Sequence, residues 1–347
     1  MLLAGDVGGT KTRLGLFDAI GRRPPQLVTR EYATLDFPSL VAMLEDFRKA
    51  AGSGSAIDAA CFGVAGPVIG NVGQLTNVPW RVEADRIAGM FSIRRVSILN
   101  DLEATAHAVP LLDSTELHTL QEGMFRRDGN IAVIAAGTGL GEALLHRVAG
   151  RYIPSPGEGG HADFAPRNER EIAVLRDVTM RFGRASVEHV LSGPGLQNLH
   201  RVTHRIGDPE RVALQNTHRT SDAERVARQK ACPAAEDEDD TVSAAAISRA
   251  ALEKKCPECV EALEMFVDIY GAEAGNLALR SLATGGVFVG GGIAPKILPA
   301  LTDGRFMRAF LAKPPHVALL SSMPVHVIIN TDAALIGAAV CAGTLAD

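Results

Sequence analysis

The feature that most constrains the fold is a strand–glycine turn–strand unit that occurs twice. In 3-LAGDVGGTKTRLGLFD-18 a short apolar run ends in an acid, two glycines and two threonines follow, and apolar and polar residues then alternate again. The segment 131-IAVIAAGTGLGEALLHR-147 repeats this arrangement. Short apolar runs bounded by turn residues predict buried strands, so each segment predicts a hairpin. The repetition indicates two related domains that face one another.

Helix-like and strand-like patterns alternate in the N-terminal part of the chain. The runs 59-AACFGVAGPV-68 and 95-RVSILN-100 are short, continuous and apolar, which predicts buried strands. Residues 38–51 have helical spacing, with Ser39 as the cap. Interleaved strands and helices favour an α/β layer architecture. We expect a first unit from residue 2 to about Pro110 and a second unit after it.

The second unit contains stronger helix signals. Residues 168–182 begin with Asn168 and carry Glu171 three positions later, the pattern of a capping box. Ser192 precedes another predicted helix, which tolerates Pro194 in its first turn.

The rest of the chain combines a polar segment with apolar ones. Residues 208–240 are polar and end in EDEDD, so we expect a solvated insertion there. Long helical segments are predicted over 242–284 and a strand over 325–330. Asp332 is expected to cap a final helix over 333–343, which is apolar nearly all round and is therefore predicted to be buried.

Composition excludes several classes of protein. A chain of 347 residues with 46% hydrophobic and 22% charged residues is typical of a globular protein and favours two domains over one. The net charge of −5 argues against a nucleic-acid partner. No apolar run approaches a membrane span, and the N-terminal residues lack the features of a signal peptide. Five scattered cysteines fit thiols in a reducing cytoplasm.

Three glycine turns follow apolar strands: 8-GGTKT-12, 137-GTGLG-141 and 290-GGG-292. An anion binds well where backbone N–H groups converge and no Cβ obstructs its approach. Three such turns in one chain, two of them rich in hydroxyls, favour a nucleotide. We therefore expect a polyphosphate ligand, with Asp6 assisting its magnesium ion through water.

Two common phosphate motifs do not fit the sequence. A P-loop requires GxxxxGK followed by Ser or Thr, and that pattern is absent. A Rossmann fingerprint at 137–141 would need a helix directly after the glycines, and EALLHRVAGRY leaves no room for one before Pro154.

Carboxylates and an imidazole gather near the predicted turns. In 95-RVSILNDLEATAHAV-109, Asn100 and Asp101 lie where a buried strand gives way to a helix, so either could simply cap that helix. Glu158 and His161 follow in 154-PSPGEGGHADF-164 together with Asp163, and a further acid, Glu188, lies in 186-SVEHVLSGPG-195. Such groups are poor phosphate ligands but good hydrogen-bond partners for several hydroxyls, which indicates a polyol as the phosphoryl acceptor.

The chain resembles the bacterial glucokinases of the hexokinase–actin ATPase superfamily. The matching motifs run nearly end to end: GDVGGTKTRLGLFD, TNVPW, ILNDLEATA, GTGLGEALL, PGEGGHADFAP, VEHVLSGPGL and GGVFVGGGIAP. The resemblance implies a two-domain actin-like ATPase (ribonuclease H-like) fold, each domain having a mixed sheet with flanking helices, and an active-site cleft between them. Residues 1–110 plus 331–347 would form a small α/β domain, and 111–330 a large α+β domain.

The resemblance also implies an activity and its residues. The chain would be a homodimeric glucokinase that transfers the γ-phosphoryl group of ATP to the 6-hydroxyl of D-glucose in the presence of Mg²⁺, with Asp101 as general base. The residues that would hold glucose are Asn100, Asp101, Gly139, Glu158, His161 and Glu188. Those that would bind the nucleotide are Gly5, Asp6, Val7, Gly8, Gly9, Thr10, Gly137, Thr138, Gly139, Gly291 and Gly292.

A few positions depart from the family pattern or stand outside it. Lys11 occupies a place where many relatives carry asparagine, and it could contact phosphate or point to solvent. Cys256 and Cys259 form a lone CxxC; because zinc needs more ligands than two, we expect surface or packing thiols and assign no metal ligand. The histidines other than His161 are expected to be structural, and Trp80 to be a packing residue.

Two other functions are compatible with the scaffold. A sugar-binding regulator would need a DNA-binding helix-turn-helix, for which the sequence before the first strand leaves no room. A kinase acting on another hexose or on an N-acetylhexosamine differs only in the fine geometry of the acceptor pocket.

Overall fold

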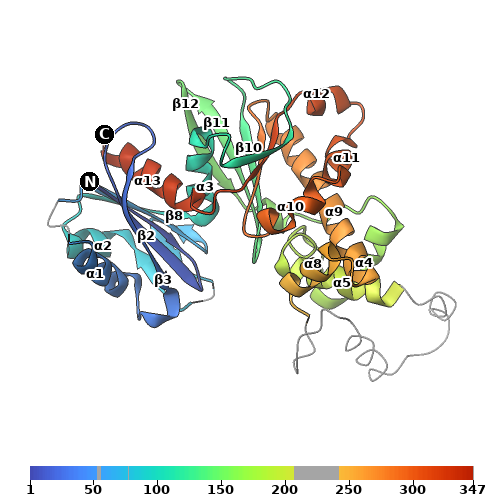
Figure 1. Cartoon of the computed structure of the whole chain (residues 1–347), viewed down its shortest axis with the longest axis horizontal. Helices are drawn as coiled ribbons and strands as arrows, with labels where there is room; N and C mark the ends of the chain where they lie inside the picture. Colours follow the sequence, from blue (N-terminus) through green and yellow to red (C-terminus); the bar gives the residue numbers. More distant parts are fainter. Residues whose placement is uncertain (53–55, 77, 207–241, 347) are drawn as a thin grey trace. The chain divides into compact units, whose positions relative to one another are not determined.

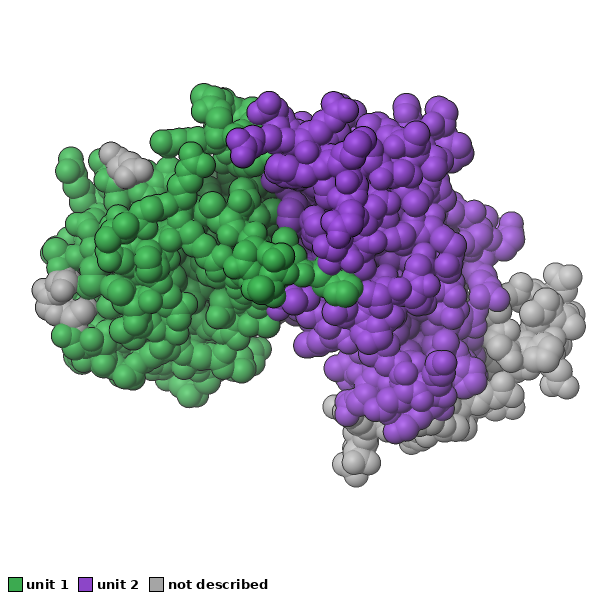
Figure 2. Space-filling model, turned by 45° about the horizontal axis from the view of Figure 1, so that its top comes forward, with its two compact units in different colours: residues 1–118, 143–156, 330–347 green, residues 119–142, 157–329 purple. Residues whose placement is uncertain are grey.

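The computed structural model describes residues 1–52, 56–76, 78–206 and 242–346. Figure 1 shows the arrangement of the elements, and Figure 2 shows the two compact units into which the described chain divides. Unit 1 comprises residues 1–118, 143–156 and 330–347, and unit 2 comprises residues 119–142 and 157–329. The insertion expected at 208–240 lies outside the described residues. The domain boundaries that the resemblance implies, after residues 110 and 330, remain a prediction.

The sheet of unit 1 is built from β1 (Leu2–Val7), β2 (Lys11–Phe17), β3 (Gln26–Ala33), β4 (Ala59–Val64) and β8 (Arg95–Asn100). Its strand order is β3-β2-β1-β4-β8. The first three strands pair antiparallel, whereas β1, β4 and β8 run parallel. The predicted N-terminal hairpin and the two predicted strands are therefore present; β4 is buried throughout, whereas β8 is fully buried only at Ile98 and Leu99. The sheet is mixed, as expected.

Helices cover both faces of this sheet. On one face, α1 (Leu40–Ala51) and α2 (Ala84–Phe91) pack their apolar side chains against strand residues such as Leu3 and Phe62. On the other face, α13 (Ala333–Ala346) packs against Leu2, Ala4 and Phe17 beside α3 (Asp101–Ala108). The expected cap of α1 is present, since Ser39 Oγ accepts a hydrogen bond from Ala42 N. A small antiparallel sheet of β5 (Val68–Ile69), β6 (Val72–Gln74) and β7 (Arg81–Glu83) lies beyond β4 in sequence.

The contact between α3 and α13 depends on one glycine. A Cβ on Gly337 would overlap the carbonyl oxygen of Ala104, so the two helices approach as closely as their backbones allow. Nearly every residue of α13 up to Ala342 is buried, which confirms the buried final helix predicted from its composition. The C-terminal helix thus supports the helix that begins with Asp101.

The second sheet is built from β9 (Leu117–Gln121), β10 (Ile131–Ala136), β11 (Leu140–Val148), β12 (Arg151–Gly157), β13 (Val287–Gly290) and β14 (Val325–Ile328). Its order is β12-β11-β10-β13-β14-β9, and β13 runs parallel to both of its neighbours. The predicted second hairpin is β10 and β11. The predicted C-terminal strand is β14.

Helices of unit 2 surround one long helix, α9 (Pro257–Ser281), much of which is buried. It contacts α5 (Gly193–Ile206), α8 (Ala244–Leu252) and α11 (Arg305–Leu311), together with the short α10 (Leu298–Leu301) and α12 (Val317–Ser321). The helix α4 (Glu169–Phe182) packs against α5 (Figure 1). The capping box of α4 is confirmed, because Asn168 Oδ1 accepts from Glu171 N at 3.0 Å. Ser192 acts as predicted at the start of α5, where its Oγ accepts from Gly195 N at 3.0 Å. Within the described part of the chain, no helix combines the length and the apolar character that crossing a membrane requires.

Candidate active site

The first glycine turn joins β1 to β2 and is held by its own backbone. Gly8 N donates a hydrogen bond to Lys11 O at 3.0 Å, and a Cβ on Gly8 would lie 2.7 Å from that oxygen. Thr34 braces the turn, since its Oγ1 donates to Gly8 O at 2.8 Å and its N donates to Thr10 O at 2.9 Å. The turn is therefore fixed in shape and lacks a side chain at its tightest point, which suits it to bind an anion.

The other residues predicted for this loop divide between the sheet and the turn. Gly5 and Val7 lie in β1 and are buried. A Cβ on Gly5 would lie 2.5 Å from the Phe62 ring, so packing alone accounts for this glycine. Gly9 and Thr10 lie in the turn itself, and Thr10 is exposed.

Charged side chains lie on β2 and β3, beside the first glycine turn. Lys11 Nζ pairs with Glu31 Oε1 at 2.6 Å, so the cation whose role the sequence left open has an acidic partner on β3. Arg13 bridges the same glutamate (Nε–Oε2 3.1 Å) and Asp332 (Nη1–Oδ1 2.6 Å). The carboxylate of Asp332, predicted to cap the last helix, is thus paired with an arginine on β2.

Asp6, near the end of β1, is partly buried within unit 1. The pKa of its carboxyl is raised from 3.8 to about 6, chiefly by desolvation and also by the neighbouring carboxylates of Asp101 and Asp332, against the opposing effect of Arg13. The carboxylates of Asp101 and Asp332 thus both lie within electrostatic reach of Asp6, and carboxylate oxygens are the ligands that Mg²⁺ uses in proteins. The donor set therefore fits Mg²⁺.

Asn100 and Asp101 lie at the junction of β8 and α3, at the carboxyl end of a parallel strand. Asn100 caps α3 through Oδ1, which accepts from Leu102 N at 3.0 Å, while its Nδ2 donates to Gly66 O at 3.2 Å. Asp101 Oδ1 accepts from the same Leu102 N at 2.9 Å. Burial raises the pKa of Asp101 against the lowering effect of these hydrogen bonds. Capping, the simpler interpretation, is confirmed for Asn100, and the Asp101 carboxylate is held in place by the helix start.

The second glycine turn, between β10 and β11, is tied to Glu188. Gly137 N donates to Gly139 O at 2.8 Å, which closes the turn around Thr138. Glu188 Oε2 accepts from Leu140 N at 2.8 Å, and a Cβ on Gly139 would lie 2.6 Å from that same oxygen. The predicted glycine therefore leaves space for a carboxylate that sequence reasoning had placed only as a sugar ligand.

Glu158, His161 and Glu188 come together as the sequence predicted. His161 Nε2 lies 3.8 Å from Glu158 Oε2, and His161 Nδ1 lies 4.0 Å from Glu188 Oε1. The short 3₁₀ helix η3 (Gly159–His161) positions the imidazole, and Glu188 N donates to Gly160 O at 2.8 Å. The side chains of Glu158 and His161 are mostly exposed, so their polar atoms are available to a ligand with several hydroxyls.

Asp163 belongs to a different pair. Its Oδ1 accepts from Arg184 Nη2 at 2.6 Å, and the same arginine nitrogen donates to His161 O at 2.8 Å. This exposed ion pair holds the backbone after η3 rather than adding a third carboxylate to the cluster.

A buried acidic pair beneath η3 was not predicted from the sequence. A Cβ on Gly159 would overlap Glu142 Oε2, so the 3₁₀ helix lies directly on this side chain. Burial and the neighbouring Glu273 raise the pKa of Glu142 to about 7, while Arg280 opposes the shift. The position of Glu142 within the GTGLGEALL motif was the one feature of the sequence that indicated a role for this residue.

The third glycine turn follows β13 next to the second one. Ile293 N donates to Ala136 O at 3.2 Å, and Gly291 has a φ of 85°, where an added Cβ would overlap Ala136 O. Gly290 ends the strand, and Gly291 and Gly292 are exposed. Both turns therefore leave the carboxyl ends of adjacent parallel strands, the edge at which α/β sheets bind ligands.

Tyr270 fixes the ends of both strands from α9. Its fully buried hydroxyl accepts from Ala136 N at 3.2 Å and lies 3.3 Å from Ile134 O and 3.1 Å from Gly290 O. Sequence reasoning missed this residue because its role depends on helix packing.

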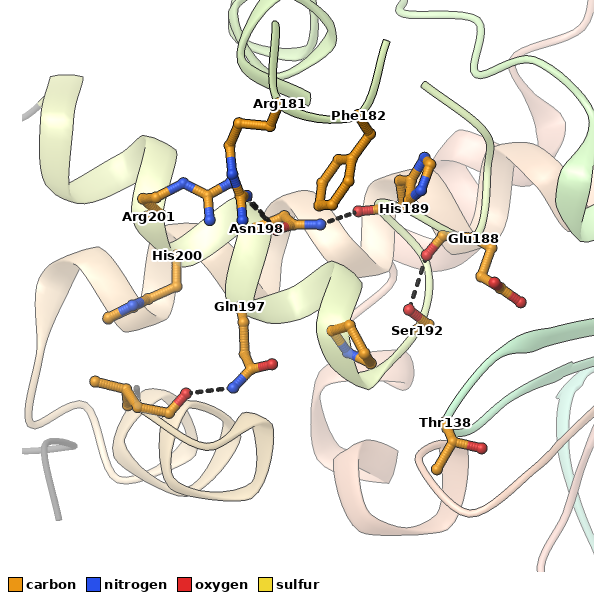
Figure 3. Close-up of a pocket in the computed structure, with 12 residues that line it drawn as sticks. Thr138, Arg181, Phe182, Glu188, His189, Ser192, Gln197, Asn198, His200 and Arg201 are labelled. Atoms are coloured by element: carbon orange, nitrogen blue, oxygen red, sulfur yellow. Dashed lines mark hydrogen bonds between the residues drawn. The ribbon is translucent and has the colours of Figure 1, made fainter. Parts of the chain in front are cut away.

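A pocket of about 330 Å³ adjoins the second turn (Figure 3). Thr138 and Glu188 line it from the candidate site, and α5 contributes Gln197 and Asn198. Asn198 is held at both ends: its Nδ2 donates to His189 O and its Oδ1 accepts from Arg181 Nη1, each at 2.8 Å. The pocket gives the candidate site a preformed polar wall.

Comparisons with known proteins agree on one family. The model of the family described as Glucokinase matches residues 3–345. A glucokinase from Nostoc sp. is 40% identical over 348 residues, covering 99% of both chains, and one from Synechocystis sp. is 40% identical, covering 98% of this chain and 97% of its own.

Solved structures give the same result for the fold. The crystal structure of glucokinase from an Antarctic psychrotroph aligns with a TM-score of 0.82 at 29% identity, over 99% of this chain and 98% of its own. A ROK family glucokinase from Streptomyces griseus, in complex with glucose and AMPPNP, aligns with a TM-score of 0.60 at 20% identity, over 99% of both chains, which supports the actin-like ATPase fold.

Proposed function

Because the chain belongs to the glucokinase family, we propose that it transfers the γ-phosphoryl group of ATP to the 6-hydroxyl of D-glucose, giving glucose 6-phosphate and ADP. ATP-dependent phosphorylation of glucose follows from the family, and the roles of individual residues are the proposal. One observation carries them: Glu188 holds the second glycine turn with one oxygen and faces His161 with the other. A single carboxylate thereby joins a phosphate-type turn to a hydroxyl-binding cluster.

Asp101 acts as the general base on the 6-hydroxyl. Its carboxylate is fixed at the start of α3 by Leu102 N, so little conformational entropy is lost when it accepts the proton. Burial raises its pKa, which makes its carboxylate a stronger base than that of an exposed aspartate. Because phosphoryl transfer has a loose transition state, positioning and charge stabilisation supply most of the rate.

The glycine turns and Asp6 serve the nucleotide. The turns over residues 8–12 and 137–141 bind its phosphates through backbone N–H groups other than those of Gly8 and Gly137, which bond within the turns. Gly291 and Gly292 lie against the adenosine. Asp6 would assist in holding Mg²⁺ through water, a role supported by the carboxylates of Asp101 and Asp332 in its neighbourhood. The ion, when bound, neutralises charge on the phosphates.

Glu158, His161 and Glu188 hold the sugar hydroxyls together with Asn100 and the backbone at Gly139. A sugar lacking one hydroxyl would leave one of these groups without its partner, which is a strong basis for discrimination. Both polar atoms of the Asn100 side chain already bond to backbone groups, so the orientation of this side chain is fixed before the sugar binds.

We also infer a homodimer in the cytoplasm. The resemblance to the family supports the dimer. Cys61 and Cys341 are neighbouring buried thiols that remain unbridged, which suits a reducing compartment.

A coupled assay of ADP formation tests the assignment. Wild type is compared with Asp101→Asn on glucose, mannose, fructose and N-acetylglucosamine. The control is Asp85→Asn, an exposed acid in the first turn of α2 in the same unit. We expect glucose to be the preferred acceptor and Asp101→Asn to lower kcat by roughly 10²–10⁴-fold, with the control close to wild type. Equal turnover by wild type and Asp101→Asn would refute the base, whereas faster turnover of another sugar would change only the substrate.

A further inference from the structure

The C-terminal half of α5 and the first turn of α9 bring together side chains of the types that bind transition metals. The ligand atoms of His200, Cys256 and Cys259 all lie within 4.8 Å of one another, and those of His204, Cys256 and Glu258 form a second such group. His200 and Cys256 are each 2% exposed, and Cys259 is fully buried. From this juxtaposition we propose that His200, His204, Cys256 and Cys259 hold a structural zinc ion.

The local geometry of both helices favours one shared site. His200 and His204 are four residues apart on α5, so their side chains lie on the same face, with ring centroids 4.3 Å apart. Cys256 is the N-cap of α9, and its Sγ accepts from Cys259 N at 3.3 Å, which turns both sulfurs toward the same end of the helix. Paired ligands spaced as HxxxH and CxxC are those used by structural zinc sites.

Hydrogen bonds between the helices hold the two ligand pairs in register. Thr203 Oγ1 lies 2.9 Å from His200 O and 3.1 Å from Glu258 O, and so connects the turn that carries the histidines to the turn that carries the cysteines. A closed site of this kind does not depend on a flexible loop for its ligands.

Charge and hydrogen bonding point to a cation at this place. His204 Nε2 is buried and finds no hydrogen-bond partner among the residues that the structure describes, although buried ring nitrogens are rarely left unsatisfied. Two thiolates and two neutral imidazoles are the forms in which these side chains bind Zn²⁺, and the charge of the thiolates would balance that of the ion. Glu258 borders the site, with its Oε2 3.3 Å from Cys256 Sγ, and adds to the negative charge there.

The donor set selects the metal. Two sulfurs and two nitrogens without an open position are typical of tetrahedral zinc. A redox role is the main rival, because a CxxC at a helix N-terminus also occurs in thiol oxidoreductases. Burial of both sulfurs opposes that rival, since an attacking thiol needs access to one of them.

A zinc ion here would stabilise the wall of the pocket beside the candidate active site. His200 lines that pocket, and α5 also contributes Gln197 and Asn198 to it (Figure 3). The ion would fasten α5 to α9, and α9 carries Tyr270. Its role is structural, and it takes no part in phosphoryl transfer.

Metal analysis of the purified, reduced full chain tests the proposal. Protein grown with added zinc is passed through a desalting column, and zinc is measured by mass spectrometry for wild type, Cys256→Ser/Cys259→Ser and the control Cys61→Ala/Cys341→Ala. The control also removes two buried thiols, but from unit 1. We expect one zinc ion per chain in wild type and control and at least a tenfold loss in the serine variant.

A second measurement keeps the test decisive if the serine variant does not fold. Wild type is stripped with a chelator and titrated with Co²⁺, and His200→Gln is treated in the same way. We expect an intense thiolate-to-cobalt charge-transfer band in wild type that Zn²⁺ displaces, and a weakened or shifted band in His200→Gln. Wild-type protein that retains no zinc and gives no such band would overturn the proposal, as would a Cys256–Cys259 disulfide found in protein purified without reductant. A change in glucokinase activity is not part of either readout, so the two proposals can fail separately.

Discussion

Replacing Asp6 by asparagine should make the ligand-free protein more stable while it weakens nucleotide binding. In the folded protein the pKa of Asp6 is raised from 3.8 to about 6, chiefly by burial. The difference of about 2.2 units corresponds to about 3 kcal/mol at about 1.36 kcal/mol per unit. At pH 7.5 the wild-type protein therefore keeps a carboxylate charged where burial and Asp101 disfavour the charge. Asparagine has a similar shape and no charge to desolvate.

The pH dependence of this effect has a definite sign. Because the folded state binds the Asp6 proton more tightly than the unfolded chain, the stabilisation is fully present below about pH 3.8 and is lost as the pH rises through about 6. Asp6→Asn has no such proton to lose. The variant should therefore exceed wild type by about 3 kcal/mol in free energy of unfolding at pH 7.5, and the two proteins should converge near pH 4.

Urea unfolding of the ligand-free proteins at several pH values measures the difference, with Asp85→Asn as the control for loss of an exposed acid. The control should differ from wild type by less than about 0.5 kcal/mol at every pH. Addition of Mg²⁺ and ADP should then stabilise wild type more than Asp6→Asn. A variant less stable than wild type at pH 7.5, or a difference that does not shrink toward pH 4, would contradict the argument from burial.

Two further substitutions test the supports of the glycine turns. Tyr270→Phe leaves Ala136 N buried without its acceptor, so the free energy of unfolding should fall by about 1–3 kcal/mol in urea titrations. The control Tyr32→Phe removes a tyrosine hydroxyl that lies near Asp46 in unit 1, and should change the free energy of unfolding by less than about 1 kcal/mol. Equal losses in both variants would exclude a special role for Tyr270. Gly139→Ala places a methyl group 2.6 Å from Glu188 Oε2, which should displace that carboxylate and raise KM for glucose roughly tenfold, the equivalent of one lost hydrogen bond. An unchanged KM would show that Glu188 is not needed at its present position.

Local signals allowed much of the fold to be predicted from the sequence. Glycine turns between apolar runs identified both hairpins, and Ser39 and Asn168 identified helix starts, because caps depend on residues three or four positions away. The buried last helix followed from its composition alone. The convergence of Glu158, His161 and Glu188 was predicted through the family resemblance, since nothing in their spacing places them together.

Contacts between distant segments could not be predicted in this way. Asp332 directly precedes its helix, as expected, and its O accepts from Ile336 N, but the pairing of its carboxylate with Arg13, which is distant in the sequence, was not predicted. The CxxC was judged to lack further ligands, because His200 and His204 are brought to it only by the packing of α5 against α9. Periodicity reports which face of a helix is buried, but it does not report which other helix covers that face.

The place of α13 in the chain has a consequence for biosynthesis. Leu2, Ala4 and Phe17 precede unit 2 in the chain, yet the helix that covers them begins at Ala333, after unit 2. One face of the first sheet therefore stays bare while all of unit 2 is translated. A message cut short before that point would yield a chain with an open apolar surface beneath the segment that carries Asp101, and we expect such fragments to be insoluble and inactive.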